Sequence, residues 1–403
     1  MVPRQGVTVA ANLSIEEPPA SSTHRIGIAM TAVIALACGL IAASSYLAQP
    51  LIVFIAPKVG LPLWGASLVI VLSQAGYCVG LVSLAPLGDL VENRRLVVLT
   101  LTGLCVALTV MAGATNAALL LVAAFSLGVG TTAVQMLIPL AAHMTDEASR
   151  GRVVGKITGG LLAGIMLARP IASIAENVLG WRGLYICDAI ILVALTFLLS
   201  QQLPVRRPEA KHGYKELIGS LLSLTRAHRA LRQLSTAQAC LFAAFSLFWG
   251  TAPIVLMHRF GFTSMGVAVF ALVGAAGALS APVAGYAADQ GFGRIGRIGG
   301  ISLVVCGFAV VGTLDSPAGW AVGALMIDAG VQASHVISQR TILALDRSAS
   351  SRLNSLYIAI FFLGGALGSA LVSPLLLINW RYISAVGALI AALAALFFPE
   401  RMQ

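Results

Sequence analysis

The sequence predicts an all-α membrane protein with twelve transmembrane helices, arranged as two similar six-helix halves. Three observations lead to this prediction: the composition is strongly apolar, the chain divides into twelve apolar runs, and landmark residues recur about 200 positions apart. Hydrophobic residues make up 58% of the 403 residues and charged residues only 10%, whereas soluble domains carry about a quarter charged residues. The mean hydropathy of +0.93 is typical of a membrane protein, and twelve spans with short loops use up 403 residues, so we expect no sizeable soluble domain.

The apolar runs have the length of membrane-spanning helices, which need roughly 20 mostly apolar residues each. They fall at 26–56, 64–86, 95–113, 117–141, 154–177 and 182–203, and again at 233–256, 264–287, 296–314, 318–338, 354–376 and 381–398. The first run is long enough for a span plus an extension at Pro50. We therefore expect a cytoplasmic tail (1–25), an N-terminal bundle (26–203), a cytoplasmic linker (204–232), a C-terminal bundle (233–398) and a second tail (399–403).

An internal repeat relates the two halves. Asp89, Asp146, Arg152 and Gly164 each lie 200 residues before an identical residue, namely Asp289, Asp346, Arg352 and Gly364. The pair Trp181-Arg182 recurs as Trp380-Arg381, at an offset of 199. Because six is an even number of spans, both halves start on the same side of the membrane, as in a parallel repeat.

The basic residues predict the orientation. Most of the 25 Lys and Arg residues lie in the termini, the linker and the loops on one side, whereas the other side carries Lys58, Arg182, Arg259 and Arg381. By the positive-inside rule both termini are cytoplasmic, and we expect a multi-pass protein of the bacterial inner membrane. The net charge of +10 then reports orientation and not nucleic-acid binding.

Several function classes lack their signatures. The six cysteines lie inside apolar runs without metal-ligand spacing, so we expect no metal or cofactor. No H-E-x-x-H, nucleophile-elbow triad or Walker-type loop is present, so neither an enzyme nor direct ATP coupling is expected. A cleaved signal peptide is disfavoured because the polar lead before the first run is long.

The ends of the second and eighth spans carry a short acidic and basic pattern. The first copy reads Ala85-Pro86-Leu87-Gly88-Asp89 followed by Glu92 and Arg94-Arg95, and the second reads Gly285-Tyr286-Ala287-Ala288-Asp289 followed by Gly293-Arg294. These copies resemble the signature Gly-x-Leu-Ala-Asp-x-x-Gly-Arg-Arg of the major facilitator superfamily. The first lacks the leading glycine, and the second has one extra residue. The twelve spans and the basic central loop match that family over essentially the whole chain.

Within the superfamily, the stretches SYLAQPL, GWRGLY and FFLGGALGSAL resemble the bacterial efflux branch of drug and sugar exporters. Two features depart from that branch. The fourth span reads AAFSLGVG without an arginine, and the glycine-proline motif of antiporters is present only loosely, as Gly160, Gly164 and Arg169-Pro170. The resemblance therefore implies transport more strongly than it implies antiport.

Two groups of residues are candidates for gating and packing. Asp89 and Asp289, with Arg94, Arg95 and Arg294, either form a cytoplasmic latch that makes and breaks ion pairs or are solvated loop charges. The pairs Gly76/Gly80, Gly160/Gly164 and Gly364/Gly368 are spaced for close helix packing.

A polar stripe on the tenth span predicts a cavity wall. Asp328, Gln332, His335 and Gln339 share one helix face, and ionisable groups inside membranes are usually functional. In the first half Gln135 corresponds to His335, and Tyr46, Gln49, Gln74 and Tyr77 are further candidates for the wall. Arg169 either pairs permanently with Asp188 or meets Asp328 in one access state, so that the proton affinity of Asp328 alternates during transport and His335 relays the proton.

These residues predict a secondary transporter with one central site and alternating access, coupled to protons and directed toward export. The wall suits a neutral, cationic or amphipathic small molecule. An ion-independent facilitator and a membrane sensor or scaffold are the alternatives, and we expect a monomer.

Overall fold

The computed structural model describes residues 27–62, 65–205, 213–346 and 349–397, and every regular element in these ranges is a helix. The first part holds α1 (Ile28–Ser44), α2 (Ala48–Lys58), α3 (Leu68–Ser83), the 3-10 helix η2 (Pro86–Asp89), α4 (Asn93–Ala112), α5 (Ala117–Thr131), α6 (Ala133–His143) and α7 (Glu147–Gln202). The second part holds α8 (Tyr214–Ala227), α9 (Arg229–His258), α10 (Ser264–Ala276), η3 (Gly277–Leu279), α11 (Ser280–Asp289), α12 (Gly293–Thr313), α13 (Pro317–Leu345), α14 (Ser350–Ala370), α15 (Val372–Ile378), α16 (Trp380–Leu393) and η4 (Ala394–Phe397). The expected tails 1–25 and 399–403 lie outside the described residues.

The number of spans follows from the length of α7. Eleven stretches of the described chain are long and apolar enough to cross a membrane, and the longest, Ser149–Gln202, has 54 residues. A continuous helix of that length would extend about 81 Å, far beyond the roughly 30 Å of a hydrocarbon core. Gly180 interrupts α7 with a φ of 64°, a left-handed conformation that glycine adopts without a steric penalty. The element therefore supplies two spans, which brings the total to the predicted twelve.

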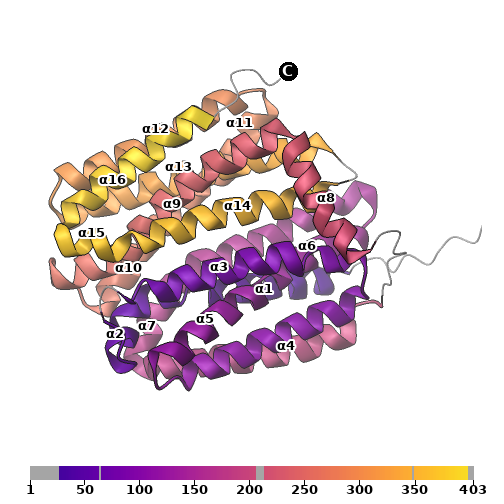
Figure 1. Cartoon of the computed structure of the whole chain (residues 1–403), viewed down its shortest axis with the longest axis horizontal. Helices are drawn as coiled ribbons and strands as arrows, with labels where there is room; N and C mark the ends of the chain where they lie inside the picture. The colour runs from indigo at the N-terminus through magenta and orange to yellow at the C-terminus, as the bar shows by residue number, and fades with distance from the viewer. Residues whose placement is uncertain (1–26, 63–64, 206–212, 347–348, 398–403) are drawn as a thin grey trace, which may run out of the picture.

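Two hydrophobic cores define the two halves. The buried residues of one core run from Ile34 to Leu203, and those of the other run from Leu231 to Ala394, joined by Leu81 of α3. Figure 1 shows the two groups of helices side by side, indigo to magenta against orange to yellow. Large apolar side chains such as Val178 and Leu389 are exposed on the outside, where a bilayer would cover them. The predicted all-α, two-half architecture is confirmed.

Matching glycines join matching helices in both halves. A Cβ on Gly164 of α7 would lie 2.1 Å from the carbonyl oxygen of Gly39 on α1, and a Cβ on Gly364 of α14 would lie 2.3 Å from the carbonyl oxygen of Ala239 on α9. Both distances are too short for any side chain, so only glycine permits these backbones to approach so closely. The packing interpretation of the glycine pairs is thereby confirmed, and the two contacts are equivalent under the internal repeat.

The two halves meet mainly along two pairs of helices, α3 with α14 and α7 with α10. On the first pair the Sγ of Cys78 donates to the carbonyl oxygen of Ala359 at 3.2 Å. Near the start of α3, the hydroxyls of Ser67 and Ser373 lie 3.1 Å apart. The structure thus connects the halves by direct hydrogen bonds as well as by apolar packing.

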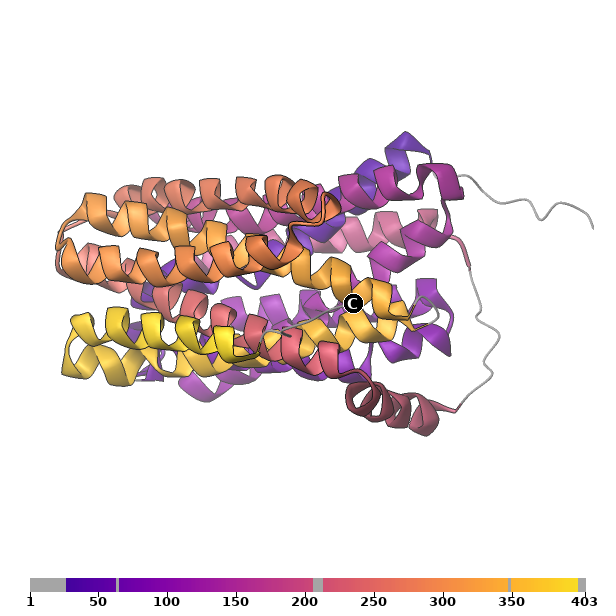
Figure 2. The same ribbon diagram turned by 90° about the horizontal axis from the view of Figure 1, so that it is seen from above.

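The linker contains a helix that the sequence analysis did not anticipate. Helix α8 lies at one end of the bundle, which we call the α8 end, and Figures 1 and 2 both place it there. The hydroxyl of Tyr214 donates to the carbonyl oxygen of Ser83 at 3.1 Å, and Arg352 donates to the hydroxyl of Ser220 at 2.8 Å. Because Ser83 ends α3 and Arg352 lies at the start of α14, α8 connects the two halves.

Candidate functional site

A buried arginine forms the centre of the candidate site. Arg169 of α7 is only 3% exposed, and its Nε donates to the Oε1 of Gln49 on α2 at 2.7 Å. Its guanidinium carbon lies 5.3 Å from the ring centroids of Tyr46 and Phe245 and 4.2 Å from that of Trp249. Aromatic faces at such distances stabilise a desolvated cation by about 2 kcal/mol. The buried Nη2 has no hydrogen-bond partner in the described structure, so it can still donate to an acceptor.

Trp249 connects this arginine to the carboxylate of the other half. The indole Nε1 of Trp249, on α9, donates to the Oδ2 of Asp328 on α13 at 2.9 Å. The indole of Trp249 therefore lies in contact with both the guanidinium of Arg169 and the carboxylate of Asp328. The cluster therefore consists of a cation from the first half and a carboxylate from the second, joined by one tryptophan.

Two glycines make room for the carboxylate. A Cβ on Gly277 of η3 would lie 2.7 Å from the Cβ of Asp328, and a Cβ on Gly274 of α10 would lie 2.4 Å from the Cζ2 of Trp249. The segment that faces Asp328 and Trp249 thus presents two glycines to them, and there α10 continues as the 3-10 helix η3. Asp328 is 4% exposed as a result.

The second intramembrane carboxylate has a different partner. The Ser44 hydroxyl donates to the Oδ2 of Asp188 at 2.7 Å, and no contact with Arg169 occurs in the described part of the chain. Of the two pairings that the sequence left open, the permanent Arg169–Asp188 pair is absent from this structure, and Arg169 faces the Trp249–Asp328 side instead.

Three of the remaining polar residues, Tyr77, Gln135 and Gln339, belong to a separate polar group nearer the α8 end. Gln135 donates to the hydroxyl of Tyr77 at 3.2 Å and accepts from the Nδ2 of Asn354 at 3.4 Å, and Gln339 donates to the Oδ1 of Asn354 at 2.9 Å. This chain runs from α3 through α6 to α14 and α13, and so crosses between the halves. We call it the amide chain, defined by Tyr77, Gln135, Asn354 and Gln339.

His335 and its neighbours are arranged differently from the predicted stripe. The Nδ1 of His335 lies 3.0 Å from the hydroxyl of Tyr357 on α14, so the imidazole turns toward α14 and not toward Asp328. Gln332 is half-buried. Gln74 of α3 donates to the hydroxyl of Ser246 on α9 at 3.3 Å. The predicted wall residues thus divide between a central cluster, the amide chain and isolated pairs.

The proposed gate residues are only partly brought together. Asp289 forms an ion pair with Arg340 of α13, a partner that the sequence analysis missed, and Arg340 also donates to the carbonyl oxygen of Gly285 at 2.8 Å. Arg294 and Arg95 are exposed and Arg94 is half-buried. Asp89 ends η2, and its side chain lies outside the described structure. The described ion pair therefore joins α11 and α13 of one half.

Trp249, Phe245 and Asn354 were not among the site residues predicted from the sequence. The aromatic run Phe245-Ser246-Leu247-Phe248-Trp249 was a usable signal, because tryptophan with a buried indole N–H usually has a hydrogen-bond partner. No cluster of three or more potential metal ligands occurs among the described residues.

Comparison with known proteins identifies the family. Residues 34–346 match the model of the Major Facilitator Superfamily. The chain is 32% identical to the uncharacterized transporter YgaY of Escherichia coli O157:H7 over 371 residues, covering 91% of this chain and 94% of that protein. It is 31% identical to the protein named "Probable transporter SCO4007" of Streptomyces coelicolor, covering 85% of this chain and 80% of that protein.

Solved structures share the same fold at low sequence identity. The crystal structure of a D-xylose-proton symporter superposes with a TM-score of 0.73 at 14% identity, covering 92% of this chain and 98% of that one. The human organic anion transporter MFSD10 gives a TM-score of 0.67 at 16% identity, covering 94% of this chain and 100% of that one. With twelve spans in two halves and a family match over most of its length, this chain belongs to the Major Facilitator Superfamily of membrane transporters.

Proposed function

We propose that this transporter exports a small organic molecule in exchange for protons, with Asp328 as the group that binds the proton. The observation that carries the proposal is the cluster of Arg169, Trp249 and Asp328. It holds a buried carboxylate and a buried cation on opposite halves of the molecule. Buried charges without close partners cost several kilocalories per mole, so each group favours states in which the other is near.

Coupling follows from relative motion of the halves. Arg169 lies on α7 and Asp328 on α13, so any rocking of one half against the other changes the distance between them. The proton affinity of Asp328 then differs between the two access states. A difference of two to three pKa units between states, at about 1.4 kcal/mol per unit, is enough to drive substrate movement with a proton gradient.

The substrate class follows from the lining of the cluster. The rings of Tyr46, Phe245 and Trp249 present flat apolar surfaces, and the unpartnered Nη2 of Arg169 offers one hydrogen-bond donor. These features favour a neutral or amphipathic aromatic solute that carries a hydrogen-bond acceptor. Export as the direction is supported by the resemblance of the segments around Tyr46 and Trp181 to the efflux branch.

Hydrogen bonds between the halves support alternating access. The amide chain joins the halves near the α8 end, which we propose to be cytoplasmic, through the 3.4 Å contact between Asn354 and Gln135. The Ser67–Ser373 contact joins them at the opposite end. Both of these hydrogen bonds are between neutral groups, and breaking one costs about 0.6 kcal/mol on average in a membrane protein.

Transport in proteoliposomes tests the proposal. The purified protein would be reconstituted with a panel of fluorescent neutral and cationic aromatic solutes, and accumulation would be followed with and without a pH gradient. We expect pH-driven accumulation in the wild type, its loss in Asp328→Asn, and retained solute exchange in that variant. Asp188→Asn is the matched control, since it neutralises the other buried carboxylate while an amide oxygen can still accept from Ser44.

Three outcomes contradict parts of the proposal. Accumulation by Asp328→Asn using the pH gradient alone excludes Asp328 as the coupling group. Equilibration without any pH effect in the wild type indicates an ion-independent facilitator. An absence of flux for every solute, in a protein that is correctly inserted, favours a sensor or scaffold.

A further inference from the structure

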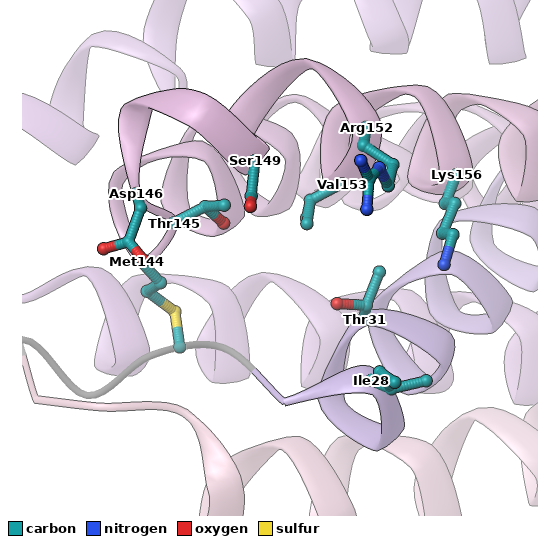
Figure 3. A pocket seen from close by; sticks show the side chains of 9 residues that line it. All are labelled: Ile28, Thr31, Met144, Thr145, Asp146, Ser149, Arg152, Val153 and Lys156. Atoms are coloured by element: carbon teal, nitrogen blue, oxygen red, sulfur yellow. The ribbon is translucent and has the colours of Figure 1, made fainter.

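A cavity lies at the α8 end of the first half, away from the central cluster. It has a volume of about 310 Å³ and is bounded by the start of α1, the connection between α6 and α7, and the first turns of α7. Figure 3 shows the side chains of Arg152 and Lys156 directed from α7 toward Thr31 on α1. A volume of this size is at the lower end of the range for small-molecule sites, roughly 300–1,000 Å³.

The lining of this cavity is basic and rich in hydroxyls. Arg152 and Lys156 are four residues apart on α7 and so lie on one face, with Ser149 and Thr31 beside them. Within the described part of the chain, neither cation donates a hydrogen bond to a protein acceptor. Asp146, the carboxylate among the described lining residues, already has an interaction of its own. The cavity therefore has cationic donors available for a ligand.

The N-terminal ends of two helices add positive electrostatic potential to that of the basic side chains. Helix α1 begins after Gly27, which has no side chain to cap it, and α7 begins after Asp146. The first backbone N–H groups of a helix lack partners within the helix, and its dipole places partial positive charge there. Both helix starts border the cavity, and such positions favour anions.

The internal repeat provides an independent comparison. Arg352 corresponds to Arg152, and in the second half its Nη1 donates to the hydroxyl of Ser220 on α8 at 2.8 Å. The linker helix thus supplies the partner for the second-half arginine. In the described structure no corresponding helix covers Arg152, and the cavity occupies that position.

We propose that this cavity binds a phosphate ester, with Arg152 and Lys156 as the charged contacts and Ser149 as a hydroxyl donor, since the Thr31 hydroxyl already donates to the carbonyl oxygen of Gly27 at 3.1 Å. Arginine forms paired hydrogen bonds to phosphate oxygens, and lysine contributes a compact charge. The phosphate has two sources in a cell membrane: the headgroup of an acidic phospholipid, or a soluble phosphorylated metabolite. The bound anion would fix the start of α1 to the start of α7.

Binding to the full-length protein in detergent tests the proposal. The probes are sn-glycerol 3-phosphate as the soluble ester and a short-chain phosphatidylglycerol as the lipid, each titrated by calorimetry. The double variant Arg152→Gln/Lys156→Gln removes both cations. The matched control, Lys215→Gln/Arg229→Gln, makes the same charge change at exposed positions outside the cavity. Arg152→Lys keeps the charge and guards against a folding defect.

We expect the cavity variant to weaken binding at least about tenfold, because it removes both charged contacts to the phosphate. The control variant should bind like the wild type, and Arg152→Lys should lie between the two. Binding of the lipid alone identifies a headgroup site, and binding of both probes identifies a site for soluble phosphate esters. The proposal is wrong if neither probe binds the wild type, or if the cavity and control variants weaken binding equally.

Discussion

The close approach of α1 and α7 allows a stability prediction with an internal control. A Cβ at Gly164 would lie 2.1 Å from the carbonyl oxygen and 2.5 Å from the Cα of Gly39. These are backbone atoms and cannot rotate away, so Gly164→Ala must separate the two helices by about 1 Å. Overpacking of this kind costs about 1–3 kcal/mol.

Gly159 is the matched control on the same helix. It is exposed, and a Cβ there meets nothing within 4 Å. Alanine is favoured over glycine in a helix by up to about 1 kcal/mol, so Gly159→Ala should leave stability unchanged or raise it. The same chemical change, five residues apart, is thus expected to have opposite effects.

Thermal unfolding of the purified protein, followed by tryptophan fluorescence, measures this difference. We expect a lower midpoint for Gly164→Ala, and for the equivalent Gly364→Ala in the second half, but not for Gly159→Ala. If both α7 variants lower the midpoint by the same amount, helix propensity or lipid contact governs stability at these glycines and the packing argument is refuted.

Three further predictions concern transport and pH. Trp249→Phe keeps a ring near Arg169 but removes the N–H bonded to Asp328. Losing this hydrogen bond costs about 0.6–1.7 kcal/mol in a membrane protein, so the pH dependence of flux should shift. An unchanged pH profile would contradict a role for the Trp249–Asp328 hydrogen bond. Asp89→Asn should lower the transport rate in proteoliposomes at equal insertion, and an unchanged rate favours a solvated loop charge. The hydrogen bond from Arg259 holds the pKa of Asp315 below its usual range, so its contribution to stability is present above the ordinary value of about 3.9 and is lost as the pH falls through the lower folded value. The difference in unfolding midpoint between wild type and Asp315→Asn should therefore shrink at strongly acid pH; a difference that is constant from pH 7 to pH 3 contradicts this.

The predicted span positions agree with the helices to within a few residues, with informative exceptions. The tenth span, expected at 318–338, is the helix Pro317–Leu345, because the polar residues that lower hydropathy after Val336 continue the same helix. Helix α8 was missed because its apolar residues, such as Leu217 and Leu221, are too few and too widely spaced to form an apolar run. They alternate with polar residues at helical spacing, a pattern typical of a helix with one buried face.

The candidate site was predicted less completely than the fold. The sequence indicated Tyr46, Gln49, Arg169 and Asp328, and the structure brings all four to one place around Trp249. The structure places His335 and Gln339 apart from these four residues. Residues on one face of a helix lie at different depths in the bundle, and at each depth they face different neighbouring helices. His335 meets Tyr357 and Gln339 meets Asn354, both on α14.

The sequence by itself determined the membrane location, the number of spans and the two-fold repeat. Each of these depends on local hydrophobicity or on a fixed offset along the chain, and a bilayer turns a run of apolar residues into a helix because every backbone polar group must be satisfied internally. Only the tertiary structure decided which charged groups meet. Asp188 pairs with Ser44, Asp289 with Arg340, and Asp328 with Trp249, because the rotation of each helix about its axis is set by side-chain packing between helices distant in sequence.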